Sequence, residues 1–424
     1  MTAGPRPGAA GTSPTKARMP SASDAPRARL APKHNTSHSV GGRPRMSRFL
    51  RILIGVTAGI HLPFVAAVGY FGTLRGWGSP WTIAWIAGLA GVVGFVWRAR
   101  AGALDKRGGQ LLPALVDIPY FVHWCACLWS LFPALFSLLI APAVELARHE
   151  PLAWPLRFYF WTYVAGLFVC AYGILVRRKW FVVRDVEVKV RGLDPKLDGY
   201  RIAHLSDLHI GTMTPRTRGD KWVVAANARR PHLAVVTGDM VTSGTAFHED
   251  IADVIGGLRA DDGVFVSMGN HDYFGDGEPL ISLLKARGAR VLRNEGALLE
   301  RAGAPLYLAG IDDTWTKRDD IERALSGRPK GVPTVLLSHD PDRFPHAAER
   351  GVDLTLAGHT HGGQIAFPFL YRWVSLARVA HRFNVGLYRQ GESWLYVHPG
   401  LGTTGPPMRL GVAPAVVILT LRAA

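Results

Sequence analysis

Cysteine is scarce in this sequence, which has three cysteines, Cys125, Cys127 and Cys170, among 424 residues. All three lie inside apolar stretches, and their spacing matches neither a zinc knuckle nor a disulfide framework. We therefore interpret them as buried free thiols. Their scarcity excludes a fold held together by disulfides but leaves the redox compartment open.

Acidic residues are nearly absent from the first 51 residues, which contain Asp24 as the single acid and ten lysines and arginines. Large apolar residues are also rare there, so this segment cannot bury enough surface to offset the entropy of ordering. We interpret residues 1–50 as a disordered basic tail, with Met46 as an alternative start of the chain. Next to a membrane span, such a tail is more often a lipid-facing cytoplasmic flank than a nucleic-acid arm.

Charged residues are scarce between residues 52 and 176, where apolar and aromatic residues dominate in four blocks. The blocks cover about 52–74, 78–97, 113–142 and 156–176, each close to the roughly 20 residues that a helical membrane span needs. A cleaved signal peptide would give one short block followed by a small-residue cleavage site, and the sequence has four blocks and no convincing site. We predict four transmembrane helices within residues 51–178.

The distribution of cations predicts the orientation of these spans. Lysine and arginine precede the first block and follow the second and fourth, whereas the other two loops contain few of them. Because cations in short loops are retained on the cytoplasmic side, the tail and the C-terminal region should both be cytoplasmic. Asp117 and His123 lie inside the third block and suggest an intramembrane function. An interfacial residue or a helix–helix hydrogen bond is the commoner explanation for each.

From Val186 onward, short β-rich runs alternate with turn signals and with segments of helical periodicity. This pattern predicts an α/β domain with layered sheets over residues 186–424. The predicted strands are Tyr200–Leu205, His232–Thr237, Gly263–Met268, Pro305–Ile311, Thr334–Leu337, Val352–Ala357, Trp394–His398 and Ala415–Leu421. The predicted helices are Lys221–Ala228, Ile251–Arg259, Pro279–Ala286 and Asp319–Leu325.

Polar motifs with metal-binding side chains follow five of these predicted strands. They read SDLHIG, TGDM, MGNHDYF, LSHDPD and AGHTHGG. Their carboxylate, imidazole and carboxamide groups suit divalent ions such as Mn, Fe or Zn. In an extended segment, side chains two residues apart point the same way. Asp207 with His209, and His359 with His361, are therefore each expected to direct a pair of ligands into one cavity.

The number of candidate ligands predicts two ions rather than one. Two ions that share a carboxylate can activate water and stabilise the displacement at phosphorus in a phosphate ester. Each motif alone is weak evidence, since Gly-Asp is a common turn and a lone histidine is more often structural. Five motifs in succession, each after a predicted strand, favour the metal site. The seven candidates are Asp207, His209, Asp239, Asn270, His339, His359 and His361.

The ordered set D-L-H, G-D, G-N-H-D, S-H-D-P and G-H-T-H resembles the calcineurin-like metallophosphoesterase superfamily, over about residues 201–421. The stretches SDLHIG, AGHTHGGQI and VHPGLGTTGPPMRLG are similar to the YkuE/YaeI group of bacterial phosphodiesterases. The resemblance implies a four-layer α-β-β-α sandwich with two divalent ions, Mn, Zn or Fe, at the C-terminal strand ends. It implies a first ion held by Asp207, His209 and His361, a second held by Asn270, His339 and His359, and Asp239 as the bridge.

The resemblance also implies catalytic roles for two neighbouring residues. His271 would serve near the leaving group as proton donor or charge stabiliser, and Asp272 would orient its ring. One departure is Ala415, because related sequences often have Pro-Glu where this one has Pro414 and Ala415. That position lies outside the ligand set. It therefore bears on the subgroup and on local packing rather than on activity.

The predicted ligands do not distinguish monoesters, diesters and pyrophosphates as substrates. The segment 367–383 is rich in aromatic and arginine residues and could rest on the cytoplasmic leaflet, although a buried loop that closes the pocket is commoner. We hypothesise a lipid-linked phosphodiester or pyrophosphate as substrate of an integral protein of the bacterial cell membrane. The alternatives are a phosphoesterase for a soluble nucleotide or phosphoprotein and a non-catalytic membrane scaffold.

Overall fold

The computed structural model describes residues 48–101, 113–148, 153–366, 375 and 377–424. The predicted basic tail therefore lies outside the described residues, except for its last three. Residues 367–374 and 376, in the segment 367–383 that was considered either as a lipid contact or as a buried loop, also lie outside the described residues.

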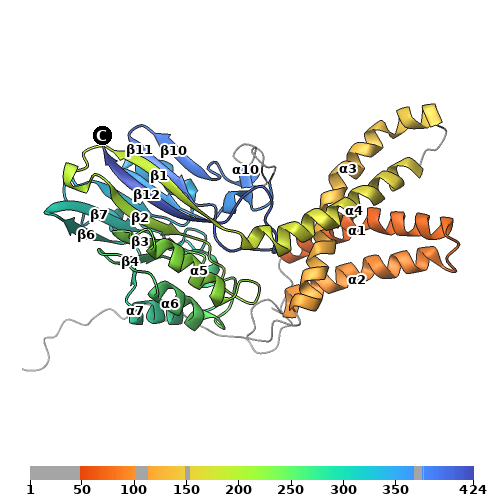
Figure 1. The fold of residues 1–424 in the computed structure, drawn as a ribbon, viewed down its shortest axis with the longest axis horizontal. Helices are drawn as coiled ribbons and strands as arrows, with labels where there is room; N and C mark the ends of the chain where they lie inside the picture. The colour runs from red at the N-terminus through yellow and green to blue at the C-terminus, as the bar shows by residue number, and fades with distance from the viewer. Residues whose placement is uncertain (1–47, 102–112, 149–152, 367–374, 376) are drawn as a thin grey trace, which may run out of the picture. The chain divides into compact units, whose positions relative to one another are not determined.

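Four long helices occupy the apolar N-terminal region (Figure 1). They are α1 Arg48–Leu74, α2 Pro80–Ala101, α3 Ile118–Arg148 and α4 Ala153–Leu175. Each is long and apolar enough to cross a membrane, which confirms the four predicted blocks. Leu139 and Phe168 are 78% and 74% exposed within the protein. Such apolar outer surfaces are typical of helices surrounded by lipid rather than by water.

Asp117 and His123 make contacts between helical segments. Asp117 belongs to the short helical turn Pro113–Asp117 before α3, and its carboxylate accepts a 2.7 Å hydrogen bond from buried Arg98 of α2. The Nδ1 of His123 on α3 lies 2.8 Å from the hydroxyl of Tyr163 on α4. The expected interhelical hydrogen bonds are thus present, and Arg98 neutralises the charge of Asp117.

Two six-stranded sheets form the C-terminal domain. The first has the order β1-β12-β2-β3-β4-β5, and the second has the order β10-β11-β9-β8-β7-β6. Strands β2, β3 and β4 are mutually parallel, as are β7, β8 and β9. The strands are β1 Val182–Val190, β2 Tyr200–Leu205, β3 Leu233–Thr237, β4 Val264–Ser267, β5 Arg290–Val291, β6 Glu295–Arg301, β7 Ala304–Gly310, β8 Thr334–Leu337, β9 Leu354–Ala357, β10 Gly386–Gln390, β11 Ser393–Val397 and β12 Ala415–Ala423.

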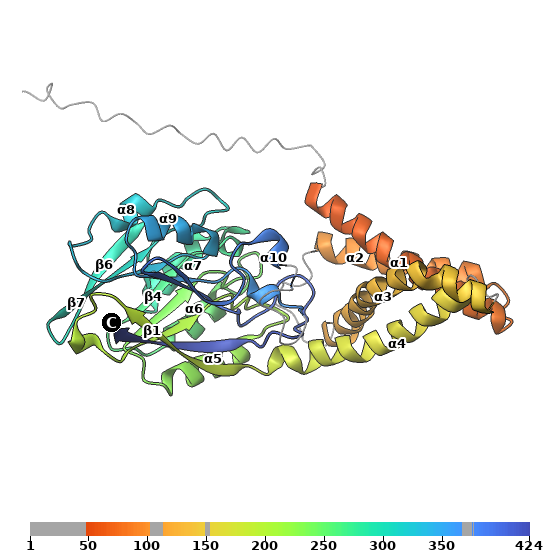
Figure 2. The ribbon, with the colours of Figure 1, turned by 90° about the horizontal axis from the view of Figure 1, so that it is seen from above.

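Helices cover the outer faces of both sheets, as Figures 1 and 2 show. Trp222, Ile255 and Leu284, one from each of three helices, pack on the first sheet. Ala324 and Ala347 pack on the second sheet. Apolar residues of both sheets fill the space between them, which gives the four layers that were expected. The helices are α5 Arg216–Asn227, α6 His248–Gly256, α7 Glu278–Ala286, α8 Ile321–Leu325, α9 Phe344–Glu349 and α10 Ala377–Ala380.

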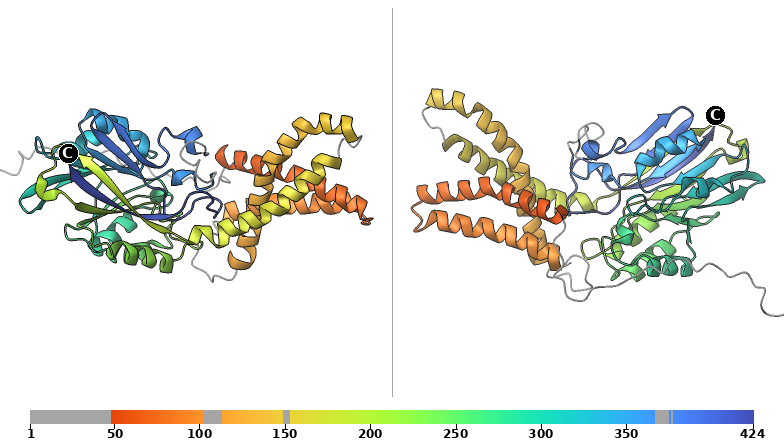
Figure 3. Two further views of the ribbon diagram at one scale, coloured as in Figure 1. Left: turned by 45° about the horizontal axis from the view of Figure 1, so that its top comes forward. Right: turned by 180° about the vertical axis from the view of Figure 1, so that it is seen from behind.

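The sheet domain begins earlier than the sequence indicated. Strand β1 starts at Val182 rather than at Val186, and it pairs along its whole length with β12. Arg184, Asp185 and Glu187 interrupt its apolar pattern because β1 is an edge strand with one partner. Strands β6 and β10 were missed for the same reason. Figure 3 shows the ribbon from two further sides.

Candidate metal centre

Loops at the C-terminal ends of parallel strands bring the seven predicted ligands together. Asp207 and His209 follow β2, Asp239 follows β3 and Asn270 follows β4, all in the first sheet. His339 follows β8, and the last two ligands follow β9, both in the second sheet. The two sheets therefore each supply part of the site at one shared edge, where loops can vary without disturbing the core.

The aspartates and histidines form two groups that share one carboxylate. In the first group, donor atoms of Asp207, His209, Asp239 and His361 all lie within 4.8 Å of one another. Donor atoms of Asp239, His339 and His359 meet the same limit in the second group. Asp239 belongs to both groups, and the assignment of ligands to two ions stays a prediction.

Asn270, which follows β4, has a buried and unpaired side-chain oxygen. Its side chain is 3% exposed, and its Oδ1 has no hydrogen-bond partner within the described part of the chain. A buried amide oxygen without a partner is costly. Its cost disappears if the oxygen coordinates a cation, so Asn270 fits the ligand role.

Backbone conformation at the ligands differs from the prediction. The expected extended segments are wrong, because Asp207, His209, Asp239, His359 and His361 have φ of 53°, 43°, 53°, 71° and 52°. This left-handed region disfavours side chains with a Cβ and costs about 1–3 kcal/mol per residue. Tight turns after each strand thus bring the side chains together. The surrounding fold must offset the conformational cost of these turns.

Two glycines allow the loops to approach the carboxylates. A Cβ at Gly269 would collide with Oδ1 of Asp239, and a Cβ at Gly358 would collide with the side chains of Ser206 and Asp207. Any side chain at these positions would displace a ligand. Glycine at both positions therefore allows the close approach of the backbone to these carboxylates.

Backbone carbonyls orient the rings of three histidines. The Nδ1 of His339 donates to the carbonyl of Thr237 at 2.7 Å, and that of His209 donates to Val241 at 3.0 Å. Since a carbonyl oxygen only accepts, each ring carries a proton on Nδ1 and directs its Nε2 toward the centre. The Nδ1 of His271 likewise lies 2.6 Å from the carbonyl of Thr242.

Asp272 has a different role from the one expected. Its carboxylate accepts hydrogen bonds from the backbone N–H groups of Asp239, Met240, Val241 and Gly269, at 2.8 to 3.1 Å. The prediction that Asp272 orients the ring of His271 is therefore wrong, and Thr242 holds that ring. Asp272 instead ties the loop after β3 to the loop after β4, because its oxygens satisfy N–H groups of both.

Burial and neighbouring charges shift the pKa values of the cluster strongly. Burial lowers the pKa of His209 and of His359 to about 3, and nearby imidazoles lower both further. Burial raises the pKa of Asp207 to about 6. Burial also opposes ionisation of Asp239 and His339, but their mutual attraction outweighs it and raises the pKa of His339 to about 10. Buried carboxylates in such surroundings are stabilised by bound cations.

Arg409 is a buried residue of the site that the sequence did not reveal. It is fully buried, and its Nη2 lies 3.2 Å from Nδ1 of His361. The guanidinium donates to the carbonyl of Pro399 at 2.6 Å and to that of Gly402 at 2.6 Å. The backbone N–H of Arg409 also donates to the carbonyl of Gly173 in α4, at 3.3 Å. Arg409 thus links the last turns of a candidate membrane helix to a ligand of the first group.

Known proteins share these features. A family model described as calcineurin-like phosphoesterase matches residues 200–363. The uncharacterized metallophosphoesterase YkuE of Bacillus subtilis (strain 168) is 32% identical over 229 residues, which cover 53% of this chain and 80% of that protein. The chain belongs to the calcineurin-like metallophosphoesterase family.

Another relative of this metallophosphoesterase has a name that mentions a membrane. The transmembrane protein with metallophosphoesterase domain of Danio rerio is 33% identical over 270 residues, which cover 60% of this chain and 61% of that protein. This chain thus spans about three fifths of that relative's length. An uncharacterized metallophosphoesterase of Aquifex aeolicus (strain VF5) is 31% identical over 236 residues, which cover 54% of this chain and 87% of that protein.

Exposed aromatic side chains flank the centre of this metallophosphoesterase. Trp315 is 61% exposed, and its ring lies 5.3 Å from that of His359 in an edge-on arrangement. Phe274 is 48% exposed and lies 4.5 Å from the ring of His271. Large apolar groups that remain exposed beside a polar centre are typical of ligand-binding surfaces.

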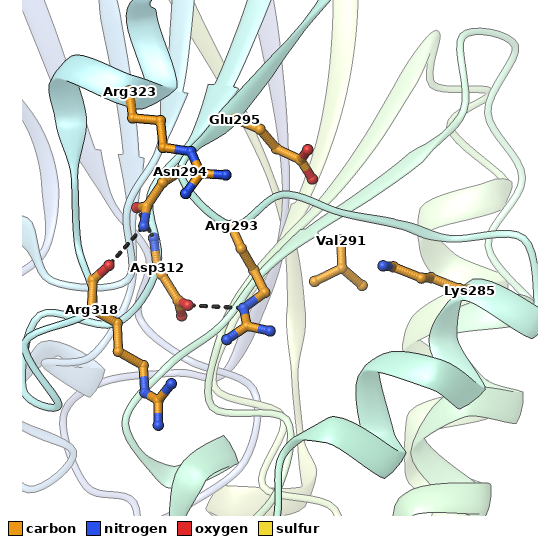
Figure 4. Close-up of a pocket in the computed structure, with 8 residues that line it drawn as sticks. All are labelled: Lys285, Val291, Arg293, Asn294, Glu295, Asp312, Arg318 and Arg323. Atoms are coloured by element: carbon orange, nitrogen blue, oxygen red, sulfur yellow. Dashed lines mark hydrogen bonds and ion pairs between the residues drawn. The ribbon is translucent and has the colours of Figure 1, made fainter. Parts of the chain in front are cut away.

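A separate cavity of about 530 Å³ lies beside β5 and the start of β6 (Figure 4). It is lined by Lys285, Val291, Arg293, Asn294, Glu295, Asp312, Arg318 and Arg323. None of the seven candidate ligands lines it, and Arg293 and Asp312 neutralise one another at 2.9 Å. We therefore place the chemistry at the Asp and His cluster rather than in this cavity.

Proposed function

We propose that this chain is a membrane-anchored phosphohydrolase that cleaves phosphodiester or pyrophosphate bonds with two divalent ions. The observation that carries the proposal is the pair of Asp and His groups that share Asp239. When bound, Mn, Zn or Fe ions would supply positive charge for the phosphoryl oxygens and activate water for attack at phosphorus. Asp207, His209 and His361 would hold one ion, and Asn270, His339 and His359 would hold the other.

His271 is the candidate proton donor to the leaving group. Its Nδ1 donates to the carbonyl of Thr242, so a neutral ring presents an unprotonated Nε2 to the cluster. A protonated ring would donate its Nε2 hydrogen to the departing oxygen or stabilise the charge there. Asp272 supports this step indirectly, since it fixes the loop that carries both His271 and Asn270.

The helices support a location in the bacterial cell membrane with a cytoplasmic catalytic domain. Arg177, Arg178 and Lys179 form a basic turn directly after α4, and the sheet domain follows this turn. Cations beside a span favour the cytoplasmic side. Green fluorescent protein fused after Ala424 should fluoresce, because it folds in the cytoplasm. If alkaline phosphatase fused at the same position were active, which requires export, the proposed orientation would be wrong.

A lipid-linked phosphodiester or pyrophosphate is the proposed substrate class. The four candidate spans and the exposed rings of Trp315 and Phe274 beside the centre support it. Replacement of Trp315 by alanine should lower turnover of a vesicle-borne phospholipid about tenfold and spare a soluble chromogenic diester. Leu298→Ala is a matched control, since Leu298 is an exposed apolar residue on β6. Equal loss on both substrates would favour a soluble nucleotide or phosphoprotein instead.

The first test is hydrolysis of bis(p-nitrophenyl) phosphate by full-length protein in detergent. The protein is stripped of metal and supplied with Mn, Zn, Fe or Mg. Activity should require metal and should vanish in Asp239→Asn, whereas His346→Ala on α9 should retain it. Metal-loaded, folded protein without activity on esters of any class would contradict the proposal and favour a scaffold.

A further inference from the structure

A second cluster of metal-binding side chains lies among the apolar helices. It consists of His61 on α1 and of His123 and Cys127 on α3. One donor atom from each residue lies within 4.8 Å of the other two. His61 and Cys127 are 2% and 0% exposed. Since His123 and Cys127 are four residues apart on one helix, they lie on the same face.

His61 has a buried ring nitrogen without a hydrogen-bond partner. Its Nδ1 lies 2.6 Å from the carbonyl of Thr57, so the ring carries its proton there and Nε2 has a free lone pair. The described part of the chain offers this Nε2 no hydrogen-bond partner. In hydrocarbon, no water can replace the missing partner, and the unpaired group remains costly.

Tyr159 of α4 supplies a fourth polar group. Its hydroxyl interacts with the thiol of Cys127, which is a weak partner, and it has no other partner among the described residues. Tyr163, one turn later on α4, holds the Nδ1 of His123 at 2.8 Å. The Nε2 of His123 lies 3.8 Å from Sγ of Cys127. A hydrogen bond therefore holds the Nδ1 of His123, as is usual for the second ring nitrogen of a histidine that binds metal.

The donor set selects a thiophilic ion. Imidazole and thiolate ligands favour Zn²⁺ or Cu⁺ over Mg²⁺ or Ca²⁺. One thiolate neutralises Cu⁺, and a thiolate with a phenolate neutralises Zn²⁺, so neither complex leaves a net charge in the low-dielectric helix bundle. A tetrahedral ion needs donors roughly 3.3–3.8 Å apart, as bond lengths of about 2.0–2.3 Å dictate. Small side-chain rotations close the remaining gap.

We propose that α1, α3 and α4 form an intramembrane metal site in which His61, His123 and Cys127 bind Zn²⁺ or Cu⁺, with Tyr159 beside them. This site is distinct from the centre at the sheet edge. It explains why polar donors converge inside an apolar bundle. An ordinary hydrogen-bond network would instead pair the Nε2 of His61 with a donor.

The test uses Co²⁺ as a spectroscopic probe of the site in full-length, metal-stripped protein in detergent. A thiolate ligand gives an intense near-ultraviolet charge-transfer band, and the sheet-edge centre has no sulfur ligand. We expect the band in the unaltered protein and in Asp239→Asn, which loses hydrolysis. Failure of this inference and failure of the proposed hydrolysis are therefore separate results. Metal analysis of protein as isolated then distinguishes Zn from Cu.

Variants of the three cysteines make the test specific. Cys127→Ser should abolish the band, whereas Cys125→Ser and Cys170→Ser should retain it, since all three thiols are buried and free. Gly91→Ala removes no ligand, but its methyl group would collide with Nε2 of His61. It should weaken Co²⁺ binding about tenfold or more. A band that persists in Cys127→Ser, or no band in the unaltered folded protein, would overturn the proposal.

Discussion

The two clusters of metal-binding residues are built by different physical means. At the sheet edge, the ligands lie on loops, five of them have left-handed backbone conformations, and backbone carbonyls fix their rings. Among the helices, His61, His123 and Cys127 lie on regular α-helix, where residues one turn apart share a face. The comparison teaches that strain accompanies the centre proposed for catalysis, whereas helical periodicity and the packing of α1 on α3 assemble the other cluster.

Loss of the shared carboxylate should have the largest effect on the sheet-edge centre. Asp239→Asn removes the group common to both sets of ligands. Two-metal stabilisation is worth several kcal/mol, so we expect kcat/KM for bis(p-nitrophenyl) phosphate to fall about a thousandfold or more. Co²⁺ binding by the helix cluster should be unchanged. A variant with near-normal hydrolysis would contradict the bridging role.

Removal of the candidate proton donor should have a smaller effect that is confined to turnover. His271→Ala leaves all seven candidate ligands in place, so metal affinity should stay unchanged. We expect kcat to fall about a hundredfold, the lower end of the usual range for general acid catalysis. The deficit should shrink for a substrate whose leaving group needs no proton. A uniform deficit across leaving groups would argue against proton donation.

Arg409→Gln tests whether the guanidinium beside His361 matters for the first group of ligands. Arg409→Gln removes the cation beside His361 and part of its hold on the carbonyls of Pro399 and Gly402. Because the guanidinium fixes the loop that packs beside His361, through the carbonyls of Pro399 and Gly402, we expect the misplaced loop to weaken metal binding at the first group about tenfold. Excess metal should restore kcat. Arg422→Gln, at a surface ion pair, is the control.

The pH dependence of metal binding should differ between the two groups at the sheet edge. In metal-free protein, His339 is protonated below its pKa of about 10 and must lose that proton to bind an ion. Affinity at the second group should therefore rise about tenfold per pH unit between pH 7 and 9. The pKa values of His209 and Asp207, about 3 and about 6, predict little change at the first group. Chelator competition measures both.

Much of the sheet-edge centre could be predicted because its ligands follow apolar strands. Asp239 comes directly after β3 and Gly238, so a local pattern sufficed to find it. Left-handed backbone at Asp207 has no comparable signal in the sequence. The sequence also has no signal for the contact between Arg409 and His361, because Arg409 lies 48 residues beyond His361 in the chain.

Edge strands and interhelical contacts could not be predicted from the sequence, for other reasons. Strands β1 and β10 carry charged residues because only one side of each is paired. The contact between His61 and His123 depends on how α1 and α3 pack, which composition does not specify. His123 was nevertheless noticed, since a polar side chain inside an apolar block is costly.

The most direct test of the central claim is electron paramagnetic resonance of the Mn²⁺-loaded full-length protein. Two ions that share the carboxylate of Asp239 should give an exchange-coupled spectrum at two equivalents of Mn²⁺. The same protein should hydrolyse the chromogenic diester, and Asp239→Asn should give the six-line spectrum of isolated ions without hydrolysis. A spectrum of isolated ions in the active, unaltered protein would contradict a shared two-metal centre.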